Sequence, residues 1–182
     1  NLSDLFIEIK KHIKNENLTI SNSEETILKG RASSLKRCFE NVINNGDIIY
    51  IGKTEKSQKS RDAQTHFKSG KTGSSTLRRS LGAILRQDLG LHPIPRSKTE
   101  SRMRDYKFIE ESEKQLTAWM VDNLSLSYFI INEGKRIIRK AEIEIINEIN
   151  PILNITHNLS SPYVSMLKEL RKKCKLIAKE QG

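Results

Sequence analysis

Hydrophobic residues recur along this chain with two spacings, and each spacing predicts a different kind of element. Recurrence every three or four residues is typical of amphipathic helices and marks residues 1–14, a segment beginning at Ser75 or Thr76, residues 110–123, a segment beginning at Gly134, and residues 161–179. Alternation, or a short apolar run rich in β-branched residues, is typical of strands and marks residues 38–43, 47–51 and 124–132. We therefore expect an α/β (α+β) fold: a small three-stranded, mainly antiparallel sheet flanked by helices, with additional N- and C-terminal helices.

Turn-forming residues separate these predicted elements. Residues 44–46 read Asn-Asn-Gly between the first two strands, and both residue types tolerate the positive φ that tight hairpin turns require. Gly52 ends the second strand. Residues 91–104 contain Pro93 and Pro95 among several basic residues, so we expect a loop there rather than a regular element.

A loop rich in Gly, Ser and Lys spans residues 68–75. Its backbone N–H groups, together with Lys68 and Lys71, are suited to binding phosphate oxygens. It lacks the preceding strand and the Gly-Lys-Ser/Thr ending of a nucleotide-binding loop, which argues against ATP binding. In the helix that follows, Arg79 and Arg86 face away from the apolar stripe, so we expect both arginines to be free to bind phosphate.

The charge balance agrees with an anionic partner. Lys and Arg number 32 against 22 Asp and Glu, which gives a net charge of +10 over 182 residues. An excess of this size suggests a polyanion such as nucleic acid, although a generally basic surface would give the same total.

Cysteines and hydropathy restrict the class of protein further. Cys38 and Cys174 are far apart and belong to no cluster with metal-ligand spacing, so neither a disulfide framework nor structural zinc is expected. Charged residues interrupt every apolar run, so we expect no signal peptide and no transmembrane helix. These features predict a soluble intracellular protein, cytoplasmic or nucleoid-associated.

One acidic residue interrupts the apolar face of the helix that begins at Gly134. At 100° per residue, Glu142 falls within the stripe formed by Ile138, Ile145 and Ile149. A carboxylate in such a position is costly unless it is paired or bound to a metal. The residues alone leave two interpretations open, an ion pair with a neighbouring arginine and a metal ligand.

Two tripeptides in the predicted hairpin stand at a fixed spacing. Residues 50–52 read Tyr-Ile-Gly, and residues 37–39 read Arg-Cys-Phe, so that Phe39 lies eleven residues before Tyr50. Arg61 follows on a short predicted helix, and Glu142 lies nine residues before the proline of a Pro-x-x-Asn exit. This ordered set resembles the GIY-YIG nuclease superfamily over roughly residues 37–158.

The resemblance implies an endonuclease that hydrolyses DNA phosphodiester bonds with Mg²⁺ (or Mn²⁺). It assigns Tyr50 as general base, Arg61 as phosphate clamp and Glu142 as metal ligand, with Lys53 and His66 in support. A single carboxylate suits Mg²⁺, which prefers oxygen ligands and keeps several waters. Because tyrosine ordinarily has a pKa of about 10, its use as a base requires neighbouring positive charge.

The chain departs from the family pattern at two positions. Phe39 stands where the family has tyrosine, and it keeps the ring but lacks the hydroxyl. His66 follows Arg61 by five residues, so both reach one site only if the helix begins between them or bends. Phe39 leaves three accounts open: an enzyme that works with Tyr50 alone, a weakened or inactive member retained for DNA binding, and a different register, which the eleven-residue spacing disfavours.

These observations divide the chain into three segments. We expect an N-terminal helix and linker at residues 1–34, a GIY-YIG-like catalytic domain at 35–158 and a basic C-terminal helix at 159–182. Two other functions compete with nuclease activity: a non-catalytic nucleic-acid-binding module, and a protein-interaction domain whose basic surface meets acidic partners.

Overall fold

The computed structural model describes residues 48–53, 66–97, 105–124 and 134–181. The predicted N-terminal helix, the strands at 38–43 and 124–132, Phe39 and Arg61 lie outside these residues. Within them the elements follow in the order η3 (Thr72–Ser74), α4 (Thr76–Leu85), β1 (Pro93–Pro95), β2 (Tyr106–Phe108), α5 (Glu110–Asn123), α6 (Lys135–Ile149) and α7 (Tyr163–Glu180).

The helices begin where the sequence predicts them. Ser75 is the N-cap of α4, and its side-chain oxygen accepts a hydrogen bond from the Arg78 N–H group. Gly134 is the N-cap of α6, and α5 spans the predicted residues. No helix among the described residues combines the length and the apolar character that crossing a bilayer requires.

The sheet differs from the prediction. The described residues contain two short antiparallel strands, β1 and β2, in the register Pro93↔Phe108 and Pro95↔Tyr106. The expectation of a plain loop over residues 91–104 is therefore wrong for β1. The fold class is mixed α/β as expected, but a three-stranded sheet is not seen in the described part of the chain, where residues 48–53 are not assigned as a strand.

The register explains how a strand can contain two prolines. Hydrogen bonds flank the pair on both sides, from Ile109 N to His92 O and from Arg96 N to Asp105 O, both at 3.1 Å. The even-numbered residues of this segment therefore point their backbone groups at β2. Pro93 and Pro95 occupy the alternate positions, where a missing N–H group costs no hydrogen bond in a strand with one partner.

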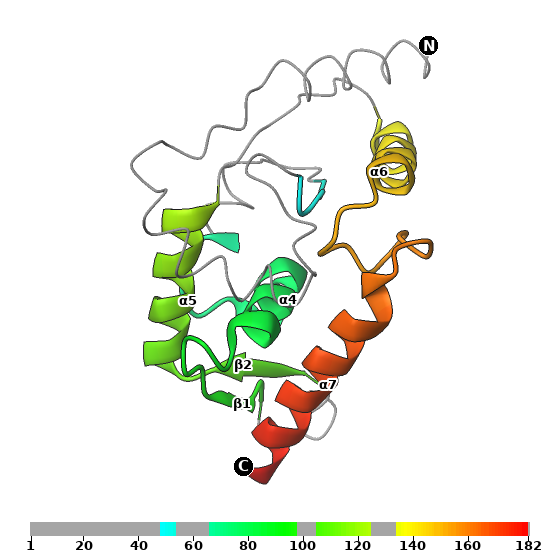
Figure 1. Cartoon of the computed structure of the whole chain (residues 1–182). Coiled ribbons are helices and arrows are strands. Elements are labelled where there is room, and N and C mark those ends of the chain that lie inside the picture. The colour runs from blue at the N-terminus through cyan, green and yellow to red at the C-terminus, as the bar shows by residue number, and fades with distance from the viewer. Residues whose placement is uncertain (1–47, 54–65, 98–104, 125–133, 182) are drawn as a thin grey trace.

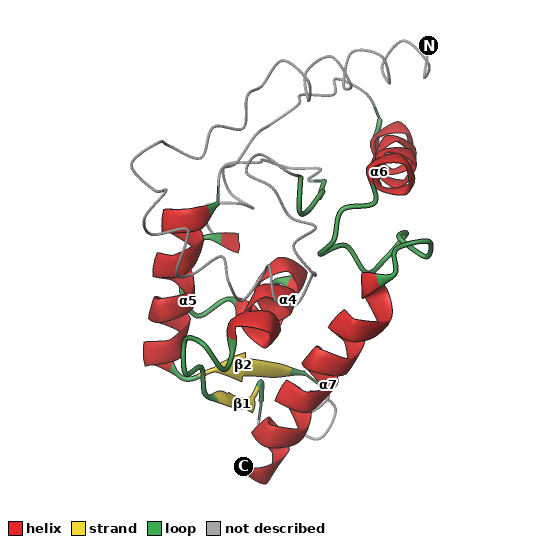
Figure 2. Cartoon of the chain, viewed as in Figure 1, coloured by secondary structure: helices red, strands yellow, loops and turns green. Residues whose placement is uncertain are grey.

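Helix α4 lies at the centre of the described structure. Figure 1 shows α5 on one side of it, α7 on the other and the β1–β2 pair at one end. Helix α7 packs along both α4 and β1, whereas α6 stands away from this group and reaches it through the loop before α7 (Figure 2). The loop after α6 therefore connects the helix that carries Glu142 to the rest of the structure.

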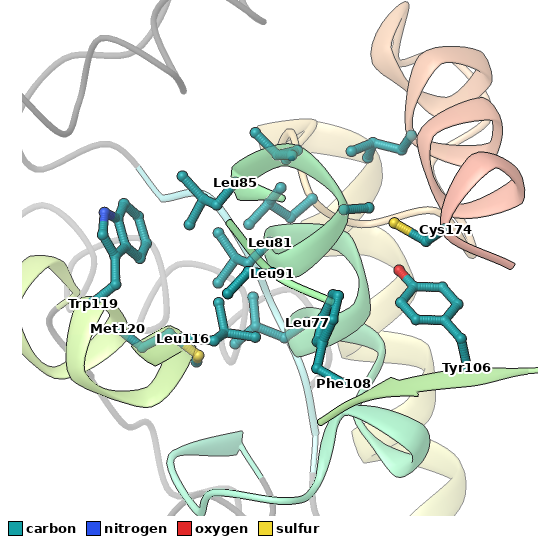
Figure 3. Packing of buried hydrophobic residues seen from close by; sticks show 14 of the residues in the cluster. Leu77, Leu81, Leu85, Leu91, Tyr106, Phe108, Leu116, Trp119, Met120 and Cys174 are labelled. Carbon is teal, nitrogen blue, oxygen red and sulfur yellow. The ribbon is translucent and has the colours of Figure 1, made fainter. Parts of the chain in front are cut away.

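The core forms around the apolar stripe of α4. Leu81 and Leu85 are buried against Leu116 and Met120 of α5, as Figure 3 shows. Trp119 is 2 % exposed and belongs to the core. On the α7 side, the Tyr106 hydroxyl group points toward the Cys174 sulfur (Figure 3), and burial raises the pKa of both groups.

Gly82 allows α4 to approach β2 closely. A Cβ atom at this position would lie 2.8 Å from Phe108 Cζ and 3.2 Å from Leu116 Cδ2, and closer still to Phe108 Cε2. The Phe108 ring is 2 % exposed, so it has little room to move away.

We expect Gly82→Ala to lower the free energy of unfolding by up to about 2 kcal/mol. Overpacking a core costs about 1–3 kcal/mol, and the gain of about 1 kcal/mol in helix propensity offsets part of that cost. Urea unfolding of the purified protein measures the difference. Gly134→Ala is the matched control, because nothing lies within 4 Å of the added methyl group. Equal stability of the two variants would contradict the packing argument.

Candidate active site

The backbone around Tyr50 is fixed by the segment that follows α6. Leu153 N donates to Ile49 O at 2.9 Å. The Asn154 side chain accepts from Ile51 N through Oδ1 and donates to Ile51 O through Nδ2, both at 2.8 Å. Because Ile49 is bonded to Leu153 and Ile51 to the adjacent Asn154, the backbone is fixed on either side of Tyr50.

Asn154 is in turn held in place at the end of α6. The helix ends at Asn150, which has a left-handed φ of 51°, and Pro151 follows it. Asn158 Nδ2 then donates to Pro151 O at 2.8 Å and to Asn154 O at 3.1 Å. Asn154 therefore connects the chain after α6 to the segment that includes Tyr50.

Glu142 joins the same arrangement from within α6. Its Oε1 atom accepts a hydrogen bond from the Lys53 backbone N–H at 3.1 Å. Residues 49, 51 and 53 therefore all turn backbone groups toward the α6 segment, which is the alternation of an extended chain. Glu142 is half-buried, between fully buried Ala141 and Ile145, as its place in the apolar stripe predicts. No ion pair with an arginine is seen for Glu142 among the described residues.

His66 lies beside Tyr50 on the other side. The two ring centroids are 5.8 Å apart with an interplanar angle of 69°, an edge-to-face contact. His66 is 5 % exposed, and its Nδ1 atom lies 2.7 Å from Ser75 Oγ. Ser75 Oγ also accepts the Arg78 N–H, so one hydroxyl group joins His66 to the first turn of α4.

A buried ion pair holds the backbone of His66. Arg78 and Glu113 are 0 % and 1 % exposed, and Arg78 Nη2 lies 2.8 Å from Glu113 Oε2. Arg78 Nη1 donates to His66 O at 3.0 Å, and Nε donates to Thr72 Oγ1 at 3.2 Å. Burial lowers the pKa of Arg78, and the Glu113 carboxylate opposes that effect. The pair thus ties the backbone of His66 to α5.

Glu113 also occupies the loop that we expected to receive phosphate. Its Oε2 atom accepts from Gly70 N at 3.1 Å and from Thr72 Oγ1 at 2.9 Å. These donors of the 68–75 loop are therefore satisfied by a carboxylate of the protein itself. Lys68 is exposed and Lys71 half-buried, and their contact with phosphate stays a prediction.

The arginines of α4 are less open than the sequence suggests. Arg79 Nη1 lies 2.7 Å from Asp105 Oδ2, and the Arg79 side chain is 14 % exposed. Arg86 is half-buried and lies near α7, where its charge lowers the pKa of Cys174 against the effect of burial. The expectation that Arg79 projects freely is wrong, because α7 packs against this face of α4.

The described residues fit a metal that needs few protein ligands. They contain no group of three or more His, Cys, Asp or Glu side chains that could hold an ion together. Glu142 offers one half-buried carboxylate, of which Oε1 is engaged by a backbone N–H group. A hard cation that keeps most of its water, such as Mg²⁺, suits a site of this kind.

Comparison with protein families identifies the chain. The family model of the GIY-YIG catalytic domain matches residues 7–173. The chain belongs to this family. Comparisons with curated proteins and with solved structures gave no match. The match extends beyond both ends of the expected 35–158 domain, and the three-segment division stays a prediction.

The GIY-YIG family is a family of nucleases, so membership implies a nucleic-acid substrate. The structure brings together Tyr50, His66 and the Lys53–Glu142 contact, whereas Arg61 and Phe39 lie outside the described residues. Sequence reasoning did not single out Arg78 and Glu113. Each is a charged residue on a helix face that is otherwise apolar, and this is the pattern that singled out Glu142 in the sequence.

Proposed function

We propose that this GIY-YIG protein is a metal-dependent endonuclease that hydrolyses DNA phosphodiester bonds. The observation that carries the proposal is the direct connection of Tyr50 to Glu142 through residues 49–53. Hydrogen bonds between this short segment and Leu153, Asn154 and Glu142 hold a phenol and a carboxylate in a fixed relation. Catalytic groups need such fixation, because misplacement by about 1 Å can cost about 100-fold in rate.

In this proposal, each side chain has a separate task. Tyr50 accepts the proton of the attacking water, and His66 supports its ring by the edge contact. Lys53 and the net positive charge of the chain favour the phenolate that a base requires. Arg61 holds the phosphate through its planar guanidinium group.

Glu142 is the residue that would hold the metal. Its Oε2 atom is the candidate ligand, since Oε1 accepts the Lys53 N–H. Bound Mg²⁺ or Mn²⁺ would supply positive charge to the phosphate and to the departing 3′ oxygen. The buried isoleucines beside Glu142 limit water access and strengthen these electrostatic interactions.

We expect wild-type protein to nick supercoiled plasmid in Mg²⁺ or Mn²⁺ and not in chelator. Tyr50→Phe keeps the aromatic ring and removes the hydroxyl, so cleavage should fall by about 10²–10⁴, the usual value of one proton-transfer group. Tyr163→Phe, at a half-buried tyrosine that begins α7, is the matched control and should cleave at the wild-type rate. A Tyr50→Phe protein as active as wild type would sink the assignment.

A second candidate function rests on Phe39. A GIY-YIG domain without the first tyrosine could bind DNA without cutting it. That protein would show salt-dependent DNA affinity in the same preparation that fails to nick plasmid in either metal. A protein-interaction domain would show neither cleavage nor a steep salt dependence of DNA binding.

A further inference from the structure

Three arginines surround one carboxylate where α4, β1 and α7 meet. Asp105 Oδ2 lies 2.7 Å from Arg79 Nη1 and 3.5 Å from Arg96 Nη1. Arg171 of α7 lies close enough to Arg79 and Asp105 for both charges to act on it. Among the described residues, Asp105 is the carboxylate that forms ion pairs with this cluster. The cluster therefore carries an excess of positive charge.

The positive charges in this cluster are only partly compensated. Burial lowers the pKa of Arg171, and the charge of Arg79 lowers it further, while Asp105 acts in the opposite direction. Arg79 Nε is buried and has no hydrogen-bond partner in the described residues. Neighbouring guanidinium groups repel one another, and an anion placed between them removes that repulsion. Guanidinium groups match phosphate oxygens in both charge and geometry.

The cluster lies next to the candidate active site. Arg79 N donates to Ser75 O at 3.0 Å in the first turn of α4, and the Ser75 side chain contacts His66. Tyr50 is among the groups whose charge acts on Arg171.

We propose that Arg96 and Arg171, oriented by Arg79 and Asp105, bind a DNA backbone phosphate close to the phosphate that is cleaved at Tyr50. The location of the cleaved phosphate rests on the proposed function. The Arg96 side chain is 39 % exposed and therefore accessible to DNA. The Arg79 side chain is 14 % exposed and adds positive charge from within the protein. Contacts of this kind position DNA without reading its sequence.

The test is the salt dependence of DNA affinity. A fluorescein-labelled duplex is titrated with wild type, Arg96→Gln, Arg171→Gln and the double variant, in chelator so that no cleavage occurs. The double change should lower the slope of log affinity against log salt by about 0.9, the value for one phosphate, and each single change by part of that amount. Arg171→Lys keeps the charge and should keep the slope. Lys114→Gln is the control with an unchanged slope, because Lys114 belongs to α5, which Figure 1 shows on the opposite side of α4 from α7.

An unchanged slope in the folded double variant would overturn the proposal. Circular dichroism of each variant establishes folding, and if Arg171→Gln does not fold, the exposed Arg96 decides alone. The measurement is independent of cleavage. Loss of slope in a protein that never nicks plasmid would support the phosphate site and reject the nuclease proposal, whereas nicking with an unchanged slope would do the reverse.

Discussion

Glu142→Gln should abolish plasmid nicking while the protein stays folded. The Gln side chain retains an oxygen that can accept the Lys53 N–H, so the connection to the Tyr50 segment survives. The substitution removes only the negative charge, and a neutral amide is a poor ligand for Mg²⁺. Initial nicking rates in Mg²⁺ and in Mn²⁺ measure the effect, which we expect to reach at least about 10³-fold, the scale of losing several kcal/mol of charge stabilisation.

Glu144→Gln provides the matched control on the same helix. Glu144 lies two residues from Glu142, and its carboxylate is 3.9 Å from Lys140 on the solvent side of α6. This variant should nick plasmid at the wild-type rate. The DNA affinity of Glu142→Gln in chelator should stay within a few fold of wild type, because without metal the Glu142 carboxylate does not bind the DNA phosphates. Wild-type nicking by Glu142→Gln would show that the carboxylate is structural.

The helices could be predicted from the sequence because their signals are local. Ser75 and Gly134 stand at the caps that bound α4 and α6, and the apolar spacing between caps and ends is regular. The strand β1 could not be predicted in this way, because two prolines argue against it by composition. Only the register with β2 shows that Pro93 and Pro95 occupy the positions where no hydrogen bond is lost.

Some residues of the candidate site could be identified from local sequence patterns, and others only from tertiary packing. Glu142 could be singled out from its place in an apolar stripe, and the same angular argument puts Glu113 on the face of Leu116 and Met120. Arg171 could not be found so, because its neighbours Arg79 and Asp105 come from segments more than sixty residues earlier. The close approach of α7 to α4 decides which arginines are open, and that approach is a property of tertiary packing.

The contact between His66 and Tyr50 depends on tertiary structure that the local sequence does not reveal. The five-residue step from Arg61 leaves the direction of His66 open in the sequence. In the structure His66 is placed by Ser75 and by the carbonyl contact from Arg78, both of which belong to α4. The two residues that determine its position thus lie nine and twelve residues later in the chain, at the start of another element.

Arg78→Met should be the most destabilising of the single changes described here. It leaves the Glu113 carboxylate buried without its charge partner, which typically costs about 3–5 kcal/mol. The double variant Arg78→Met/Glu113→Leu should be more stable than the two single costs predict, because no lone charge remains. It should still be less stable than wild type, since Thr72 Oγ1 and Phe108 N lose their acceptor. Urea unfolding of all four proteins gives the coupling free energy directly.

Helix α5 carries the matched control for this buried pair. Lys114 and Glu110 form an ion pair at 2.7 Å with side chains 67 % and 82 % exposed, and Lys114→Met should leave the unfolding midpoint unchanged within error. If Arg78→Met behaved like Lys114→Met, the buried pair would carry no net stabilisation. In the expected case, nicking by the folded fraction of Arg78→Met should also fall. The lost Arg78 contact frees the His66 carbonyl, and the imidazole then no longer holds a fixed position beside Tyr50.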